Sequence, residues 1–248
     1  MLKKILVFIL LFAPLTLTAD HHALESRAVV EIYECMLNEG SSVQDVVALA
    51  RTDFKAWVTE NDIRVNTFIW EPVAVTPPYH EAEVRWINYF QTWADYGAAS
   101  EAWTKPSNGK QAAKINAMTT CAKPVFTTST PVAQMPTDTP KKPLIVGVCN
   151  LNDGATFAEA AKYLSSSRVD AVNAAIGAQT GMMLWTPGFG INPDFDFLQV
   201  VSGTHDDMMA LFDGVRTGTV QKAQTAFNAT PSPASCHWDL STSYAITQ

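Results

Sequence analysis

Three polar side chains in the first half of the chain could do chemistry together, namely Glu31, Tyr33 and Arg85. Glu31 and Tyr33 are two positions apart in a β-branched run, so on a strand both point to the same face. Arg85 belongs to a later strand-like run that we expect beside the first. A buried carboxylate or guanidinium needs a partner or a ligand, which predicts a polar site in a cavity. The alternative is a solvated ion pair on an exposed face, which contributes little.

Two tryptophans occupy equivalent places in the sequence. Trp70 and Trp185 each open a Trp-x-Pro segment, 115 residues apart. They could form the wall of an apolar pocket whose mouth the prolines shape. They could equally be paired core residues where two repeats meet, because duplication preserves packing as well as sites. The sequence favours neither interpretation.

Motifs for metal or cofactor binding are missing. The histidines have neither metal-ligand spacing nor a triad arrangement. The chain has no P-loop, no Gly-x-Ser-x-Gly and no His-Glu-x-x-His, and Gly188 begins a lone Gly-x-Gly in a predicted loop between strands. We therefore expect no metal and no cofactor. Whether the protein is an enzyme is not decided by its motifs.

The four cysteines lie in a repeated framework. Cys35 and Cys149 each begin a Cys-x-Leu-Asn-acid-Gly motif after an apolar run. Each has a second cysteine downstream, Cys121 and Cys236, at separations of 86 and 87 residues. Four cysteines allow three pairings, and the duplication selects Cys35–Cys121 and Cys149–Cys236. A zinc site is disfavoured because no Cys-x-x-Cys or clustered Cys/His spacing occurs.

The N-terminus predicts export. Lys3 and Lys4 precede an apolar run and then Ala19, a small residue at the cleavage position, which is typical of a secretory signal peptide over residues 1–19. The apolar run of about 13 residues is short for a membrane span, which needs about 20. We therefore expect a periplasmic or secreted protein with no membrane anchor after cleavage.

Charge narrows the range of partners. Losing the two lysines of the signal peptide takes the net charge from −7 to −9. An acidic chain without Lys/Arg clusters repels phosphate backbones and anionic lipids, which argues against nucleic acid and membrane surfaces as partners. The apolar fraction of 47% suffices for a folded core. Nothing in the sequence sets an oligomeric state.

The elements that must position these residues occur twice in the same order. Ser42 and Thr156 begin capping boxes at matching places. The proline-rich residues 131–143 predict a linker between the halves. The expected strands are 28–35, 63–75, 84–92 and 124–130, then 144–149, 182–189, 195–201 and 235–244; the expected helices are 43–58, 95–103 and 109–120, then those following Thr156 and those within 206–227.

Two matching βαββαβ units predict an α+β fold of tandem ferredoxin-like repeats, residues 28–130 and 144–248. There the fourth strand lies antiparallel beside the first, as the two disulfides require. By this order and repetition the chain resembles the dimeric α/β-barrel superfamily, in which two such units pack their sheets together. The paired cysteine motif also resembles that of exported bacterial proteins of unassigned function. The resemblance implies a cavity bounded by each sheet, in a superfamily of monooxygenases, isomerases, haem proteins and binding proteins.

Three functions are consistent with these patterns. The first is an exported protein that binds a small, largely apolar ligand in a sheet-lined cavity. The second is a cofactor-free enzyme of the monooxygenase or isomerase type, with Glu31, Tyr33, Arg85 or His80 as its polar groups. The third is a structural or interaction module whose cavity is filled by side chains.

The two halves differ where polar chemistry is expected. Ile145 and Gly147 of the second half stand where Glu31 and Tyr33 stand in the first. We therefore expect any binding or catalysis in the first half, with the second half serving mainly as scaffold.

Overall fold

The computed structural model describes residues 28–76, 82–135, 139–191 and 194–247. The predicted signal peptide, residues 1–19, lies outside these ranges, and so does His80.

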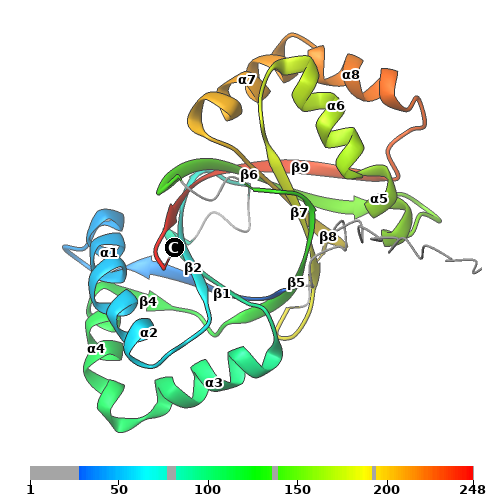
Figure 1. Ribbon diagram of the computed structural model, residues 1–248. Helices are drawn as coiled ribbons and strands as arrows, with labels where there is room; N and C mark the ends of the chain where they lie inside the picture. Colours follow the sequence, from blue (N-terminus) through cyan, green and yellow to red (C-terminus); the bar gives the residue numbers. More distant parts are fainter. Residues whose placement is uncertain (1–27, 77–81, 136–138, 192–193, 248) are drawn as a thin grey trace, which may run out of the picture.

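Within these ranges nine strands form one antiparallel sheet that closes into a barrel (Figure 1). The ring follows the order β3-β2-β9-β6-β8-β7-β5-β1, and pairing of β1 with β3 closes it. The short β4 also pairs with β1. The strands are β1 (Ala28–Leu37), β2 (Asn66–Ala74), β3 (Val84–Phe90), β4 (Thr119–Cys121), β5 (Val125–Ala133), β6 (Lys141–Leu151), β7 (Gly181–Pro187), β8 (Phe197–Ser202) and β9 (Ala234–Ala245).

The two halves of the chain arrange their strands alike. In the first half β1 lies between β5 and β3, and β2 follows β3. In the second half β6 lies between β9 and β8, and β7 follows β8. The halves join at β2 with β9 and at β5 with β7. The expected neighbourhood of the first and fourth strands is therefore confirmed in both halves.

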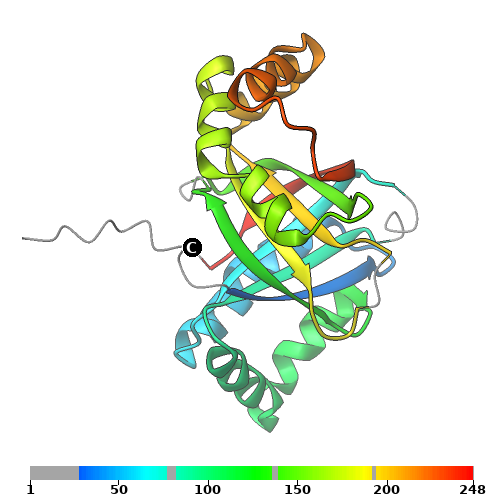
Figure 2. The ribbon, with the colours of Figure 1, turned by 90° about the vertical axis from the view of Figure 1, so that its right-hand side faces the viewer.

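Helices cover the barrel on two opposite sides, one side for each half (Figures 1 and 2). Among the described residues, no helix is both long and apolar enough to cross a membrane. The first half has α1 (Val43–Leu49), the π-helical η1 (Ala50–Phe54), α2 (Lys55–Glu60), α3 (Trp93–Thr104), the short η3 (Pro106–Asn108) and α4 (Gly109–Met118). The second half has α5 (Phe157–Tyr163), α6 (Ser166–Ile176), α7 (His205–Arg216) and α8 (Thr219–Phe227).

In the part of the chain that the structure describes, capping boxes begin four helices. Those at Ser42 and Thr156 are confirmed, and Thr92 and Thr204 form two more at the starts of α3 and α7. Each box satisfies helix N–H groups that have no partner within the helix. The first residue of each of these helices is therefore determined by nearby residues. For α3 this start also determines which side chains face the sheet.

The predicted disulfides join directly opposed strand positions. Cys35 pairs with Cys121 across β1 and β4, and Cys149 pairs with Cys236 across β6 and β9. Both predicted pairings are confirmed. Disulfides of this kind are typical of proteins in oxidising compartments.

The asparagine of each cysteine motif joins two distant segments. The side-chain amide of Asn38 donates to the backbone oxygen of Asn116 at 2.8 Å, and that of Asn152 donates to the oxygen of Ser232 at 2.8 Å. These amides therefore reach carbonyl groups just before β4 in the first half and just before β9 in the second. The glycines that follow, Gly40 and Gly154, have φ near +80°, a backbone conformation that suits glycine.

The predicted linker is shorter than residues 131–143, because strands extend into both of its ends. β5 continues to Ala133 and β6 begins at Lys141. Pro131 lies at an irregularity in the pairing of β5 with β7. Pro143 lies where β6 pairs with β9 but is already past the end of its pairing with β8. Proline has no N–H for a ladder, so strands accept it at such positions.

Candidate functional site

A row of buried polar side chains crosses three neighbouring strands of the first half. Glu31 on β1 is directly opposite Asn88 on β3, which is directly opposite Thr67 on β2. The amide nitrogen of Asn88 donates to Oε2 of Glu31 at 2.9 Å, and the hydroxyl of Thr67 donates to Oδ1 of Asn88 at 2.8 Å. All three residues are buried. Buried polar groups of this kind are tolerated when they are hydrogen-bonded to one another.

The second oxygen of Glu31 accepts a hydrogen bond from Tyr33. The phenol oxygen lies 2.9 Å from Oε1. Burial raises the pKa of Glu31 above its ordinary value, although the hydrogen bonds from Asn88 and Tyr33 act in the opposite direction. Burial and the neighbouring Glu31 carboxylate also raise the pKa of Tyr33. The carboxyl group of Glu31 therefore accepts two hydrogen bonds in a poorly solvated environment.

Glu31 and Tyr33 line a cavity of about 230 Å³ between the barrel wall and the helices of the first half. Aromatic residues form a large part of its walls. η1 and α2 contribute Phe54 and Trp57, β3 contributes Trp86, Asn88 and Phe90, and α3 contributes Tyr96, Ala99, Ser100 and Trp103.

The aromatic rings meet at steep angles. Trp57 and Trp103 are 5.0 Å apart between ring centroids with an interplanar angle of 88°. Phe54 and Trp86 are 5.4 Å apart at 71°. Edge-to-face contacts of this kind are favourable. They also leave the faces of neighbouring rings pointing in different directions.

Two of these rings carry a buried donor without an acceptor. The indole N–H groups of Trp57 and Trp86 have no hydrogen-bond partner among the described residues, and both side chains are buried. A buried N–H left unsatisfied costs free energy. The two nitrogens have almost no accessible surface, so the rings of Trp57 and Trp86, and not their N–H groups, line the cavity.

The second half replaces the polar row with apolar side chains. Ile145 lies opposite Val201, which lies opposite Met182, and these three residues belong to one hydrophobic cluster. Gly147 takes the place of Tyr33, and a Cβ atom there would lie 3.0 Å from the ring of Trp238. The indole thus occupies space that a larger side chain would need.

Arg85 does not join Glu31. Its Nε lies 3.1 Å from Oε1 of Glu34, and register places Arg85 opposite Glu34 on β1. Glu31 and Glu34 are three positions apart and so face opposite sides of the sheet. The predicted pairing of Glu31 with Arg85 was therefore wrong, and Asn88 is the partner of Glu31.

Trp70 and Trp185 lie inside the barrel. Their rings stack with centroids 5.2 Å apart and planes 18° from parallel, and Tyr89 packs edge-on against Trp185 at 5.7 Å. Both tryptophans belong to the cluster that fills the barrel between the halves. They are paired core residues, and neither lines the cavity beside Glu31.

Sequence reasoning missed most of the aromatic walls. Trp57 falls within the helix expected over 43–58, and Trp86 and Asn88 fall within the strand expected over 84–92, but none of the three is a predicted site residue. One signal was present: Asn88 is a polar residue inside an otherwise apolar and aromatic strand. Among the described residues no cluster of three potential metal ligands occurs.

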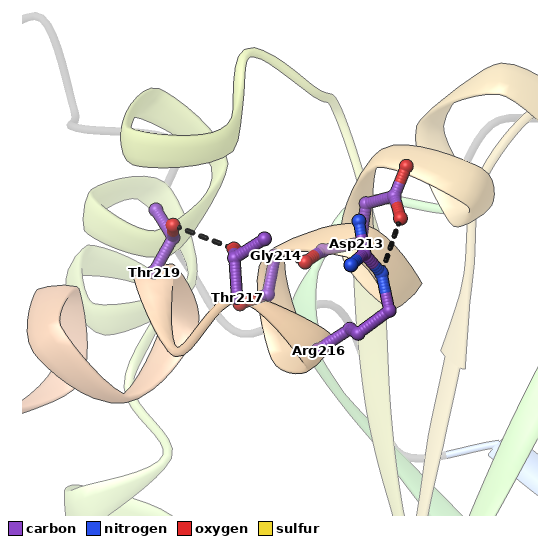
Figure 3. Close-up of polar contacts among 5 residues, drawn as sticks. All are labelled: Asp213, Gly214, Arg216, Thr217 and Thr219. Atoms are coloured by element: carbon purple, nitrogen blue, oxygen red, sulfur yellow. Dashed lines mark hydrogen bonds and ion pairs between the residues drawn. The ribbon is translucent and has the colours of Figure 1, made fainter.

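A second hollow lies on the surface at the junction of α7 and α8 (Figure 3). Its polar groups bond to one another: Arg216 pairs with Asp213 at 3.0 Å, and the hydroxyls of Thr217 and Thr219 are 2.9 Å apart. The side chains of Arg216 and Asp213 are about 70% exposed, so their ion pair is well solvated and weak. This hollow is the poorer candidate site.

Comparisons with known proteins find a distant likeness in shape. No family model and no curated protein matches the chain. A structure from Lactobacillus acidophilus NCFM, provisionally assigned as a monooxygenase, is 15% identical, with a TM-score of 0.49 over 90% of this chain and 95% of that chain. Chlorite dismutase from Candidatus Nitrospira defluvii, in complex with imidazole, is 8% identical, with a TM-score of 0.49 over 88% and 90%. Likeness at this level leaves the function to be argued from the site.

Proposed function

We propose that the protein binds a small, largely apolar molecule in the cavity between β1, β3 and the helices of the first half. The observation that carries this proposal is the cavity of about 230 Å³, whose lining combines aromatic rings with the buried carboxyl group of Glu31. The apolar part of a ligand would contact the aromatic rings, and a polar group on the ligand would reach Glu31.

The size of the cavity suits a small ligand. Its volume of about 230 Å³ is below the ~300–1,000 Å³ of pockets for drug-sized molecules. An interaction module whose cavity is filled by side chains is less consistent with this volume. A void lined by both Glu31 and Arg85, as expected for the enzyme alternative, is not what the chain forms, because Arg85 pairs with Glu34.

Native mass spectrometry of the protein purified from its own host tests the proposal, with a retained small molecule as the expected result. The Ala99→Leu variant, which narrows the cavity from α3, is expected to lose the adduct. Ala210→Leu is the matched control, because Ala210 lines the hollow at α7 and α8. If Ala99→Leu is unstable, Ser100→Leu narrows the same cavity. Adduct loss in Ala210→Leu alone would contradict the proposal.

Proton-transfer catalysis is the second candidate. It is favoured by Glu31, a cavity carboxyl group whose pKa burial raises, because catalytic acids and bases are tuned in this way. A cofactor-free enzyme of the isomerase or monooxygenase type would convert its ligand, and Glu31→Gln would stop conversion while binding continued. Recovery of an unchanged ligand after prolonged incubation would favour binding alone.

We also propose that the chain is exported, and that its barrel is the tandem form of the dimeric α/β barrel with two ferredoxin-like repeats. Two disulfides support export, since they are typical of oxidising compartments. The matching strand orders of the halves support the repeat.

A further inference from the structure

We propose that the ligand carries an ammonium group, for which Glu31 is the counter-ion and the aromatic walls are the cage. This inference rests on the proposed binding function and specifies its ligand class, a small apolar amine. Three features of the cavity carry it.

The first feature is a buried carboxylate without a cation. Among the described residues no lysine, arginine or histidine forms an ion pair with Glu31. Arg85, on the neighbouring strand, pairs with Glu34 on the other face of the sheet. A buried carboxylate is costly without an opposite charge, so a cationic ligand would complete the site.

The second feature is the orientation of the groups around the carboxylate. The Thr67 hydroxyl donates to the Asn88 oxygen, which leaves the Asn88 nitrogen facing Glu31. Tyr33 donates to the other carboxylate oxygen. An ionised carboxylate accepts at about four positions. Two protein donors therefore favour its charged form and leave acceptor positions for the N–H groups of an amine.

The third feature is the aromatic lining. Trp57, Trp86 and Trp103 border the same cavity as Glu31, and Trp86 is directly opposite Tyr33 across the strands. The faces of tryptophan rings attract cations, and cages of such rings recognise ammonium groups. An apolar cavity for a neutral hydrocarbon would need the rings but not the carboxylate.

The second half of the chain lacks the charged group at the equivalent position. Ile145 and Val201 stand where Glu31 and Asn88 stand, so its equivalent position has no charge to offer. The proposal therefore predicts one amine bound per chain.

Calorimetric titration with phenethylamine and with 2-phenylethanol separates charge from shape, since the two probes differ mainly in the ammonium group. The wild type is expected to bind the amine at least about tenfold more tightly than the alcohol at neutral pH. Glu31→Gln is expected to remove this preference by weakening the binding of the amine far more than that of the alcohol. Glu34→Gln, on the same strand but paired with Arg85, is the matched control and should retain the preference.

A second readout uses the wild type alone. At about pH 5, near the ordinary range of carboxyl groups, binding of the ammonium ion should ionise Glu31 and release protons. The observed enthalpy should then vary with the ionisation enthalpy of the buffer for the amine but not for the alcohol. The other titratable groups that line the cavity are the phenols of Tyr33 and Tyr96, and burial raises the pKa of Tyr33.

The outcomes distinguish this inference from the proposed function. Equal affinity for the two probes, or a preference that survives Glu31→Gln, would overturn the amine assignment and leave the binding function standing. Failure of both probes to bind, together with no retained molecule in native mass spectrometry, would overturn both.

Discussion

The side-chain nitrogen of Asn88 lies 2.9 Å from Oε2 of Glu31, on the strand beside it. The corresponding pair in the second half is Val201 and Ile145. One fold therefore accommodates both a polar and an apolar pair at the same place in its sheet. Since the apolar pair meets the needs of packing, the polar pair suggests a requirement beyond folding.

Exchanging the whole polar row for its second-half counterpart should preserve stability. The triple variant Glu31→Ile, Thr67→Met, Asn88→Val removes the three members of the row together and leaves only the Tyr33 hydroxyl without its partner. Replacing both partners of a buried hydrogen bond by apolar groups is often nearly neutral. Glu31→Ile alone leaves the donors of Asn88 and Tyr33 unsatisfied, which should cost about 1–3 kcal/mol. Urea unfolding measures both free energies. A triple variant less stable than Glu31→Ile would contradict this interpretation.

The stability of the protein should depend on pH through Glu31. Burial raises the pKa of this carboxyl group above the ordinary value of 4.5, so between the two values the folded state binds more protons than the unfolded state. The free energy of unfolding should therefore fall as pH rises through this window, by at most about 1.4 kcal/mol per pH unit.

Glu31→Gln lacks that titration and serves as the reference. Urea unfolding of both proteins at a series of pH values should show the wild type losing stability relative to the variant as pH rises from 4.5. A constant difference between the two proteins across this range would show that Glu31 does not titrate as argued.

The disulfide of the second half should stabilise the protein without affecting ligand binding in the first half. Replacing both Cys149 and Cys236 with serine should lower the free energy of unfolding by about 2–5 kcal/mol, since the disulfide closes a long loop in the unfolded chain. Binding in the first half should remain. Peptide mapping without reduction checks the pairing, and a peptide that joins Cys35 to Cys149 would reject it.

Two glycines should respond in opposite ways to alanine. A Cβ atom at Gly181 would lie 2.3 Å from the backbone oxygen of Gln134, so Gly181→Ala must displace the backbone and should cost more than about 1 kcal/mol. Gly97 lies within α3 with open space around it. Gly97→Ala should stabilise the helix by about 0.5–1 kcal/mol. Thermal unfolding of the two variants measures both effects, and equal changes in melting temperature would contradict the packing described.

Much of the fold could be predicted because its signals are local or repeated. Ser42 with Asp45 marks a helix start within four residues. The separation of Cys35 from Cys121 differs by only one residue from that of the second pair. Such signals need no knowledge of which face of a strand is buried.

The partner of Glu31 could not be predicted for a physical reason. β3 is apolar on both faces, because Ile87 packs inside the barrel while Trp86 packs under the helices. Alternation of polar and apolar residues then does not indicate which face of β3 lies inside the barrel and which lies under the helices. A register shift of one residue exchanges the faces, so choosing between Arg85 and Asn88 as partner required the pairing of β1 with β3.

The measurement that bears most directly on the binding site is a crystal structure of the protein grown with phenethylamine. The account predicts electron density for one molecule between β1, β3 and α3, with its nitrogen within hydrogen-bonding distance of Glu31 and its ring against Trp86 or Trp103. Density only at the junction of α7 and α8, or an empty cavity beside Glu31 at saturating probe, would contradict it.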